Sequence, residues 1–220
     1  MRQADTFRRQ NVGPRSFIDP TAQILGWRQV RIGHHTIVGE NTLINVNHRQ
    51  GPEPMVLIGD NCFIARRNFF TAGARISMGD YCLTSPDCHF LGAGHDFSSP
   101  LAPYATTGVT TDGVIEIGPN CWFGSSVIVM KNVRIGFGSV LGAGAMICSD
   151  VPPCSVVIGS PGRIVKRFDM RRKMWVKVED YPADGDSLLP DEAIYLADLR
   201  ARFPAIKGAR VAAGKASGDL

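Results

Sequence analysis

The sequence predicts an all-β fold, a parallel β-solenoid of triangular 18-residue coils with a small helical extension at its C-terminal end. Two observations lead to this prediction. Apolar residues recur at every sixth position over long stretches, and a glycine often follows them. A six-residue period fits neither the 3.6 residues of a helix turn nor plain strand alternation, but it fits a short strand and a bend, repeated. Three such units close a triangle, and triangles stacked at ~4.8 Å pair their backbones.

The repeat is clearest over residues 117–151. Each six-residue unit begins with an apolar residue, and a small residue stands four positions later. We expect both to point inward, with the glycines relieving strain at the bends. The apolar positions of this run are Ile117, Phe123, Val129, Ile135, Leu141 and Ile147, and the small ones are Cys121, Val127, Val133, Ser139, Ala145 and Val151. Earlier apolar positions in the same phase are Ile32, Val38, Ile44, Ile58, Ile64, Phe70, Met78, Thr84 and Phe90.

The cysteines fit the repeat better than they fit a disulfide framework or a zinc site. There are six, with no CxxC pair and with irregular spacing. Cys62, Cys82, Cys88 and Cys121 each occupy the small inward position. Free cysteine is well suited to such a position because it behaves as a small buried apolar side chain.

Composition narrows the class of protein. The chain has 220 residues and 44% hydrophobic residues, enough for one substantial domain and an appendage. The formal net charge of +4 is too small to indicate nucleic-acid binding, but it is compatible with an anionic small ligand. Neither a signal-peptide run nor ~18 consecutive apolar residues are found, so we expect a cytoplasmic protein.

The stretch "IGPNCWFGSSVIVMKNVRIGFGSVLGAGAMICSDVPPCSVVIGSPGRIVKRF" resembles the hexapeptide-repeat acetyltransferases, in particular the galactoside, maltose and polysaccharide O-acetyltransferases. The resemblance covers residues 18–167, preceded by a lead-in (1–17) and followed by a cap and tail (168–220). It implies a left-handed β-helix, acetyl-coenzyme A as co-substrate, no metal, and a homotrimer with sites between neighbouring chains. Met130-Lys131-Asn132 departs from the proline-glycine turn common in the family, and we expect a changed bend there.

Two interruptions of the repeat, near residues 45–56 and 96–114, are the expected functional loops. "MGDYCLTSPDCHFLGAGHD" resembles the family segment that ends in the catalytic histidine, which assigns that role to His95. Acetyl transfer to a hydroxyl needs a base, and an imidazole with a pKa near ~6.5 can serve as one at neutral pH. The group that orients His95 stays open among Asp80, Asp87 and Glu116.

The resemblance also assigns binding roles. The backbone amide of Ser125 would stabilise the oxyanion, and Trp122 would line both the acceptor and the pantetheine region. The acceptor would also contact Asn68 and Asp96. The residues expected to bind coenzyme A, besides Trp122, are Gly142, Ala143, Gly144, Arg163, Lys166 and Arg167.

The leading hypothesis is an O-acetyltransferase that modifies a sugar hydroxyl in surface or extracellular polysaccharide synthesis. One alternative is an acetyltransferase of an antibiotic or amino sugar. A γ-type carbonic anhydrase would need three zinc histidines, normally with an HxxxxH pair, and His89 and His95 are one residue too far apart. A non-catalytic solenoid is the remaining alternative. Of the other histidines, His34 and His35 are expected at a bend, His89 outward, and His48 in the first loop, near an acceptor.

The C-terminal segment should cover the open end of the solenoid. Residues 167–178 suit a helix or an extended cap. "SLLPDEAIYLADLRARF" predicts a helix with Pro190 in its first turn and Ile194, Leu196, Leu199 and Phe203 on its apolar side. Disorder is expected after Pro204.

Overall fold

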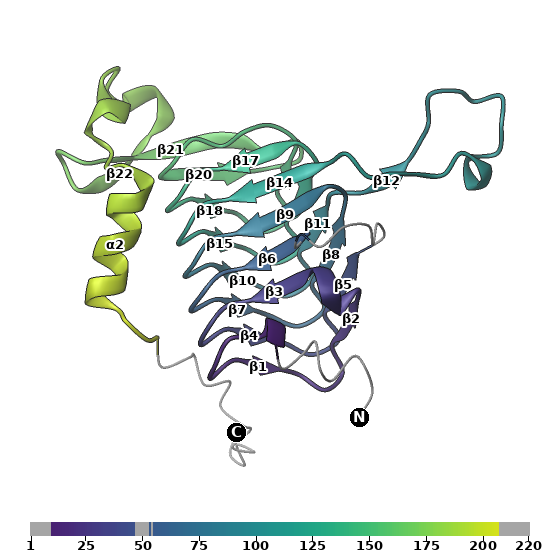
Figure 1. Ribbon diagram of the computed structural model, residues 1–220. Coiled ribbons are helices and arrows are strands. Elements are labelled where there is room, and N and C mark those ends of the chain that lie inside the picture. Colours follow the sequence, from purple (N-terminus) through teal and green to yellow (C-terminus); the bar gives the residue numbers. More distant parts are fainter. Residues whose placement is uncertain (1–9, 47–52, 54, 207–220) are drawn as a thin grey trace, which may run out of the picture.

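The computed structural model describes residues 10–46, 53 and 55–206, and it shows a three-sided parallel β-solenoid (Figure 1). We name its three sheets face A, face B and face C. Face A consists of β3 (Val30–Ile32), β6 (Val56–Ile58), β9 (Arg75–Met78), β14 (Val114–Ile117) and β17 (Val133–Ile135). Face B consists of β1 (Phe17–Ile18), β4 (Ile37–Val38), β7 (Phe63–Ile64), β10 (Leu83–Thr84), β15 (Trp122–Phe123), β18 (Val140–Leu141) and β20 (Ser155–Ile158). Face C consists of β2 (Gln23–Leu25), β5 (Leu43–Val46), β8 (Phe69–Ala72), β11 (His89–Leu91), β16 (Ile128–Met130) and β19 (Met146–Ile147).

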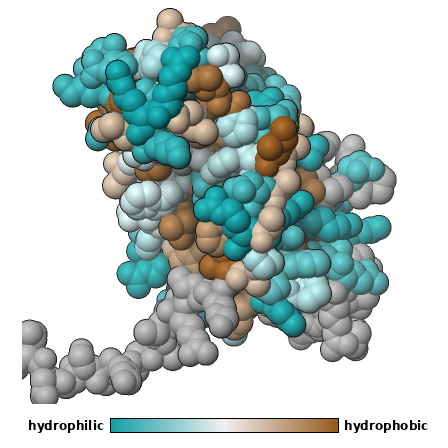
Figure 2. Space-filling model, turned by 90° about the vertical axis from the view of Figure 1, so that its left-hand side faces the viewer, coloured by the Kyte–Doolittle hydropathy of each residue, from teal (hydrophilic) through white to brown (hydrophobic). Residues whose placement is uncertain are grey.

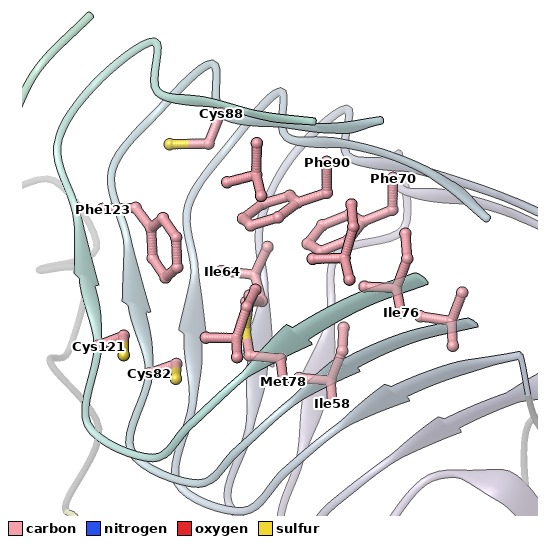
Figure 3. Packing of buried hydrophobic residues seen from close by; sticks show 14 of the residues in the cluster. Ile58, Ile64, Phe70, Ile76, Met78, Cys82, Cys88, Phe90, Cys121 and Phe123 are labelled. Carbon is pink, nitrogen blue, oxygen red and sulfur yellow. The ribbon is translucent and has the colours of Figure 1, made fainter. Parts of the chain in front are cut away.

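The interior follows the six-residue repeat. Every predicted apolar position is buried, the most exposed being Ile117 at 4%, and every predicted small position of residues 117–151 is buried too, Val151 at 5% being the most exposed. Phe70 stacks on Phe90 with 4.4 Å between ring centroids, and the edge of Phe123 meets Phe90 at 5.3 Å (Figure 3). The register predicted from the repeat is therefore confirmed.

The four cysteines predicted to point inward are buried and free. Figure 3 shows Cys82, Cys88 and Cys121 among the residues of the core. Burial raises the pKa of the Cys88 thiol to about 11. Cys148 is exposed and Cys154 is half-buried. The cysteines of the core therefore act as small apolar residues, as predicted.

The bends correct one expectation about glycine. The left-handed backbone conformation falls on the third residue of most bends and is usually not on a glycine, as at Arg67 (φ 56°), Asp87 (φ 66°) and Ser126 (φ 60°). The glycines that follow the apolar positions permit close stacking instead. A Cβ atom at Gly124 would lie 2.5 Å from the backbone nitrogen of Ala143, in the next coil.

The departure at Met130-Lys131-Asn132 is confined to a bend, as expected. β16 and β17 remain in register with their neighbours on both sides of it. Asn132 takes the left-handed conformation (φ 61°), and the Nζ of Lys131 lies 3.2 Å from a carboxylate oxygen of Asp112.

The last coil is closed by an antiparallel hairpin. β21 (Arg163–Asp169) pairs with β20 and with β22 (Met174–Lys177), so face B continues past the coils. Residues 167–178 are therefore mainly extended, which excludes the helix and supports the extended cap. Short 3-10 turns follow at Val178–Asp180 and Gly185–Leu188, and two others lie at Trp27–Gln29 and Tyr104–Thr106.

Helix α2 (Glu192–Arg202) lies along the corner between faces A and B (Figure 1). It begins later than predicted: Asp191 is the N-cap and accepts a hydrogen bond from the amide of Ala193 at 2.8 Å, so Pro190 lies outside the helix. The side of the molecule that carries α2 shows hydrophilic residues with hydrophobic ones between them (Figure 2).

Two of the residues on the predicted apolar side of α2 remain largely exposed. Ile194 is 66% exposed and Phe203 47% exposed. Tyr195 instead packs on Phe137 with 4.5 Å between ring centroids. The guanidinium of Arg200 donates two hydrogen bonds to the same carboxylate oxygen of Asp80, at 2.7 and 3.0 Å. Polar contacts thus hold this helix as much as apolar ones.

Two expectations lie largely outside the described residues. The first interruption falls between β5, which ends at Val46, and β6, which begins at Val56. The tail after Pro204 is described only as far as residue 206. Among the described helices, none has the length and apolar character needed to cross a bilayer.

Candidate active site

The predicted second interruption is an arm of residues 92–113 that projects from the corner between faces C and A (Figure 1). β12 (Gly94–His95) pairs with β13 (Val109–Thr110) to form its base. The arm thus starts slightly before the predicted boundary at residue 96. His95 is exposed, and its imidazole has no hydrogen-bond partner among the described residues.

Asp96 stabilises the arm. Its carboxylate accepts a hydrogen bond from the amide of Ser98 at 2.9 Å, and hydrogen bonding from Ser98 lowers the pKa of that carboxyl group. The Asp96 carbonyl accepts a bond from the hydroxyl of Thr107 at 2.6 Å. These contacts shape the loop that follows His95.

None of the three carboxylates considered as partners of His95 contacts it. Asp80 binds Arg200, and Asp87 binds Arg67 through both carboxylate oxygens at 2.7 Å. The hydrogen bond from Arg67 also lowers the pKa of Asp87. Glu116 is exposed on β14.

Ser125 and Ala143 occupy equivalent positions in stacked bends at the corner between faces B and C. The amide of Gly144 donates to the carbonyl of Ser125 at 2.8 Å, which fixes the stacking. Both Ser125 and Ala143 are exposed, and neither amide N–H has an acceptor among the described residues. Two open donors therefore lie one strand spacing apart, about 4.8 Å. Pro86 takes the same position one coil earlier, where the amide of Ser126 donates to its carbonyl.

The neighbouring residues predicted to bind coenzyme A lie on the same coils as these donors. Trp122 is 48% exposed on the outer side of β15. A Cβ atom at Gly142 would lie 2.8 Å from Cγ2 of Ile158, so the bend is packed closely on the next strand. Gly144 has φ +69° and open space where a side chain would begin.

The predicted basic residues on β21, just after the last coil, separate into two groups. Arg163 and Lys166 are exposed, as a phosphate-binding role requires. Arg167 is 6% exposed, donates to the carbonyl of Pro153 at 3.2 Å, and is paired with Asp186. The prediction that Arg167 binds the cofactor is therefore wrong, because its position in the hairpin turns it inward.

Asn68 is also a structural residue. It is 1% exposed, and its side-chain amide donates to the carbonyls of Ala65 at 2.8 Å and Ser85 at 3.1 Å. It cannot contact an acceptor, which corrects the prediction. The repeat contained the signal, because Asn68 stands four positions after Ile64, in the inward small position.

Sequence reasoning missed one basic residue of this region, Lys177. It lies on β22 directly opposite Lys166 and is exposed. No sequence pattern relates the two residues, since their pairing depends on the hairpin register. In the described part of the chain, no group of three His, Cys, Asp or Glu side chains is placed to hold a metal ion. His34 is exposed at a bend, His35 and His89 are half-buried, and His48 lies outside the described residues.

Within one chain, His95 and Ser125 lie beyond opposite edges of face C. Ser125 precedes β16, while the arm begins after β11, the strand paired with β16. Five residues of extended chain separate Ser125 from Met130 at the far edge, or about 16 Å. The two groups therefore cannot act on one carbonyl carbon within the same chain.

Comparisons with known proteins confirm the resemblance seen in the sequence. A Staphylococcus aureus protein named "Putative acetyltransferase" is 38% identical over 115 residues, which are 52% of this chain and 56% of that protein. The galactoside O-acetyltransferase of Escherichia coli is 29% identical over 151 residues, covering 60% of this chain and 73% of that enzyme. The chain thus spans about half the length of the first of these curated relatives. No family model matches the sequence.

Solved structures share the fold. AntD, an N-acyltransferase from Bacillus cereus in complex with dTDP and 3-hydroxybutyryl-CoA, superimposes with a TM-score of 0.61 and 23% identity over 76% of this chain and 88% of AntD. Galactoside acetyltransferase in complex with coenzyme A gives a TM-score of 0.53 and 22% identity, over 78% of this chain and 72% of that enzyme.

Proposed function

We propose that this protein is an acetyl-coenzyme A dependent O-acetyltransferase that acts on a sugar hydroxyl. The observation that supports this most directly is that the chain presents both an exposed imidazole, His95, and open amide donors at Ser125 and Ala143. A base and an oxyanion donor are the two groups that acyl transfer from a thioester requires. Similarity to the galactoside O-acetyltransferase supports the hydroxyl as acceptor.

In the proposed reaction, His95 removes the proton of the acceptor hydroxyl while its oxygen attacks the thioester carbon. Negative charge develops on the carbonyl oxygen, and the Ser125 amide donates a hydrogen bond to it. Collapse of the tetrahedral intermediate breaks the carbon–sulfur bond. The proton held by His95 then passes to the leaving thiolate, so the products are the ester and free coenzyme A.

We further propose a left-handed solenoid that forms a homotrimer, because two copies are needed to bring His95 beside Ser125. The outer sides of faces B and C support it. Face A presents the polar residues Arg31, Ser77, Glu116 and Arg134 around Leu57. The outer row of face B is Phe17, Ile37, Phe63, Leu83, Trp122, Val140 and Val156, and face C shows Leu43, Phe69, His89, Ile128 and Met146. Packing face B of one copy on face C of the next would close a ring of three.

The exposed apolar side chains of the arm also support a homotrimer. Phe97 is 79% exposed and Leu101 94% exposed, and both lie on the part that projects from the solenoid (Figure 1). Large apolar side chains so exposed mark contact surfaces when they gather on one projecting segment. The arm would lie against the neighbouring copy and bring His95 toward its site. We place the reaction in cytoplasmic steps of surface or extracellular polysaccharide synthesis.

Complementation between two inactive variants tests the shared site. His95→Ala removes the base. Ser125→Pro removes the amide hydrogen and introduces proline, the residue that already occupies the equivalent position one coil earlier, at Pro86. Each variant alone should be inactive. In randomly mixed trimers about a quarter of the sites combine an intact His95 with an intact Ser125 of the neighbour, so co-expression should restore about a quarter of wild-type activity.

Two controls sharpen this experiment. Mixing the purified homotrimers without reassembly should restore nothing. If the co-expressed variants form mixed trimers and remain inactive, the two-chain site is wrong. The acceptor comes first from a screen of sugars with thiol-release detection. Preference for an amino sugar or an antibiotic there would replace this proposal with the alternative, an acetyltransferase of an antibiotic or amino sugar.

A further inference from the structure

The hairpin that closes the solenoid places two lysines face to face. Lys166 on β21 and Lys177 on β22 are directly opposite residues of an antiparallel pair, and both are exposed. Like charges at such positions destabilise a sheet. An anion bound between them would remove the repulsion.

The distribution of carboxylates around the hairpin agrees with a binding role. Three arginines of this segment are paired: Arg167 with Asp186, Arg171 with Asp184 at 2.6 Å, and Arg172 with Asp169 at 3.5 Å. Lys166 has no carboxylate within 4.0 Å among the described residues. Lys177 has only Glu179 at 4.0 Å, with both side chains largely exposed, an arrangement that contributes little.

Three cationic residues of the hairpin, Arg163, Lys166 and Lys177, lie on its outer face. Val156 on β20 is opposite Lys166, and Ile158 is opposite Arg163. Val156 and Ile158 alternate with the buried Val157, so they point outward, and their partners do as well. Arg163, Lys166 and Lys177 therefore share one outer face.

The distance along face B from the coil of Ser125 to the two lysines matches the length of the pantetheine arm of coenzyme A. The strand order β15, β18, β20, β21, β22 puts β21 three spacings and β22 four spacings beyond the coil of Trp122 and Ser125, or about 14 and 19 Å. The pantetheine arm joins cysteamine, β-alanine and pantoate, comparable to about four residues of extended chain, or ~13–14 Å. Lys166 is in register with Trp122 through Val140 and Val156, so a thioester between Trp122 and Ser125 would put the phosphates within reach of the long side chains on β21 and β22.

We propose that Lys177 is a binding residue for coenzyme A and that it holds a phosphate of the cofactor together with Lys166. This inference rests on the proposed function. It extends the cofactor site beyond the last coil onto β22, a strand that the six-residue repeat does not include.

The test compares Lys177→Gln with Lys173→Gln, a control with the same change of charge on an exposed residue in the turn of the same hairpin. Lys177→Gln should raise the KM for acetyl-coenzyme A about tenfold, as expected for the loss of a charge-assisted hydrogen bond. The kcat/KM for acetyl-pantetheine, which lacks the phosphates, should not change. Lys177→Arg should restore most of the affinity.

Calorimetry with coenzyme A and with adenosine 3′,5′-bisphosphate gives a readout that needs no turnover. Both ligands should bind the wild-type protein and the Lys173→Gln variant. They should bind the Lys177→Gln variant about tenfold more weakly. Equal affinities for the two glutamine variants would overturn the role of Lys177 while leaving acetyl transfer intact. Absence of any coenzyme A binding by the wild type would overturn the proposed function itself.

Discussion

Ser125→Pro should separate catalysis from stability, because it removes an amide hydrogen that the fold does not use and keeps the carbonyl that accepts the amide of Gly144. The amide of Ser125 has no acceptor among the described residues, so its loss breaks no internal hydrogen bond. Pro86 already occupies the equivalent position one coil earlier, and the residues after them, Asp87 and Ser126, share the left-handed conformation. The backbone there accepts proline.

The substitution should change both the kcat and the free energy of unfolding. Removing one oxyanion donor costs about 10²–10³ in kcat, or about 2.7–4 kcal/mol. A proline that fits the native backbone raises the free energy of unfolding by about 0.4–1 kcal/mol, because it restricts the unfolded chain. We therefore expect a large loss of activity together with an unchanged or slightly higher Tm.

The assay follows thiol release from acetyl-coenzyme A in the presence of the acceptor found by screening, with thermal unfolding measured in parallel. Ser125→Ala is the matched control, since it keeps the N–H and removes only the hydroxyl. It should stay within a few-fold of the wild type. A folded Ser125→Pro enzyme as active as Ser125→Ala would show that this amide is not the oxyanion donor.

Three further outcomes are expected. His95→Ala should lower kcat by about 10² or more at an unchanged Tm, since its side chain makes no described hydrogen bond; equal turnover in the two enzymes would exclude His95 as the base. Phe90→Ala should lower the free energy of unfolding by about 3–5 kcal/mol, measured by denaturant titration, because the ring is fully buried against Phe70; a loss under 1 kcal/mol would mean that the core closes over the cavity. At pH 8 a thiol reagent should label the exposed Cys148 in the native protein but not the buried Cys88, whose pKa of about 11 keeps it protonated. An unfolded thiol ionises near 9.0, so the contribution of Cys88 to the free energy of unfolding is fully present below that pH. That contribution is lost as the pH rises toward 11.

The coils could be predicted from the sequence because one physical requirement recurs in each. A side chain that points into a triangle of fixed size must be apolar or small, so the pattern returns every six residues. Phe70, Phe90 and Phe123 are all buried at positions that this period predicts. The same period, applied strictly, would have placed Asn68 inside as well.

The cap could not be predicted in the same way. β21 and β22 follow no six-residue period, and their register depends on a turn and on packing against β20. That register turns Arg167 inward and sets Lys166 opposite Lys177, although Lys166 and Arg167 are adjacent in the sequence. The motif therefore could not predict the direction of Arg167, because the hairpin register and not the coil sets it.

The helix on the corner has a consequence for how the molecule unfolds. In a solenoid each coil touches only its neighbours, so coils at one end can open while the others persist. α2 and the residues after it contact four successive coils: Tyr195 packs on Phe137 and accepts a hydrogen bond from the side-chain amide of Asn120, Arg200 binds Asp80, and the amide of Ile206 donates to the side chain of Asn61. Fraying of a middle coil must therefore also release a helix formed near the end of the chain. This coupling should make unfolding more cooperative than a stack of repeats alone allows.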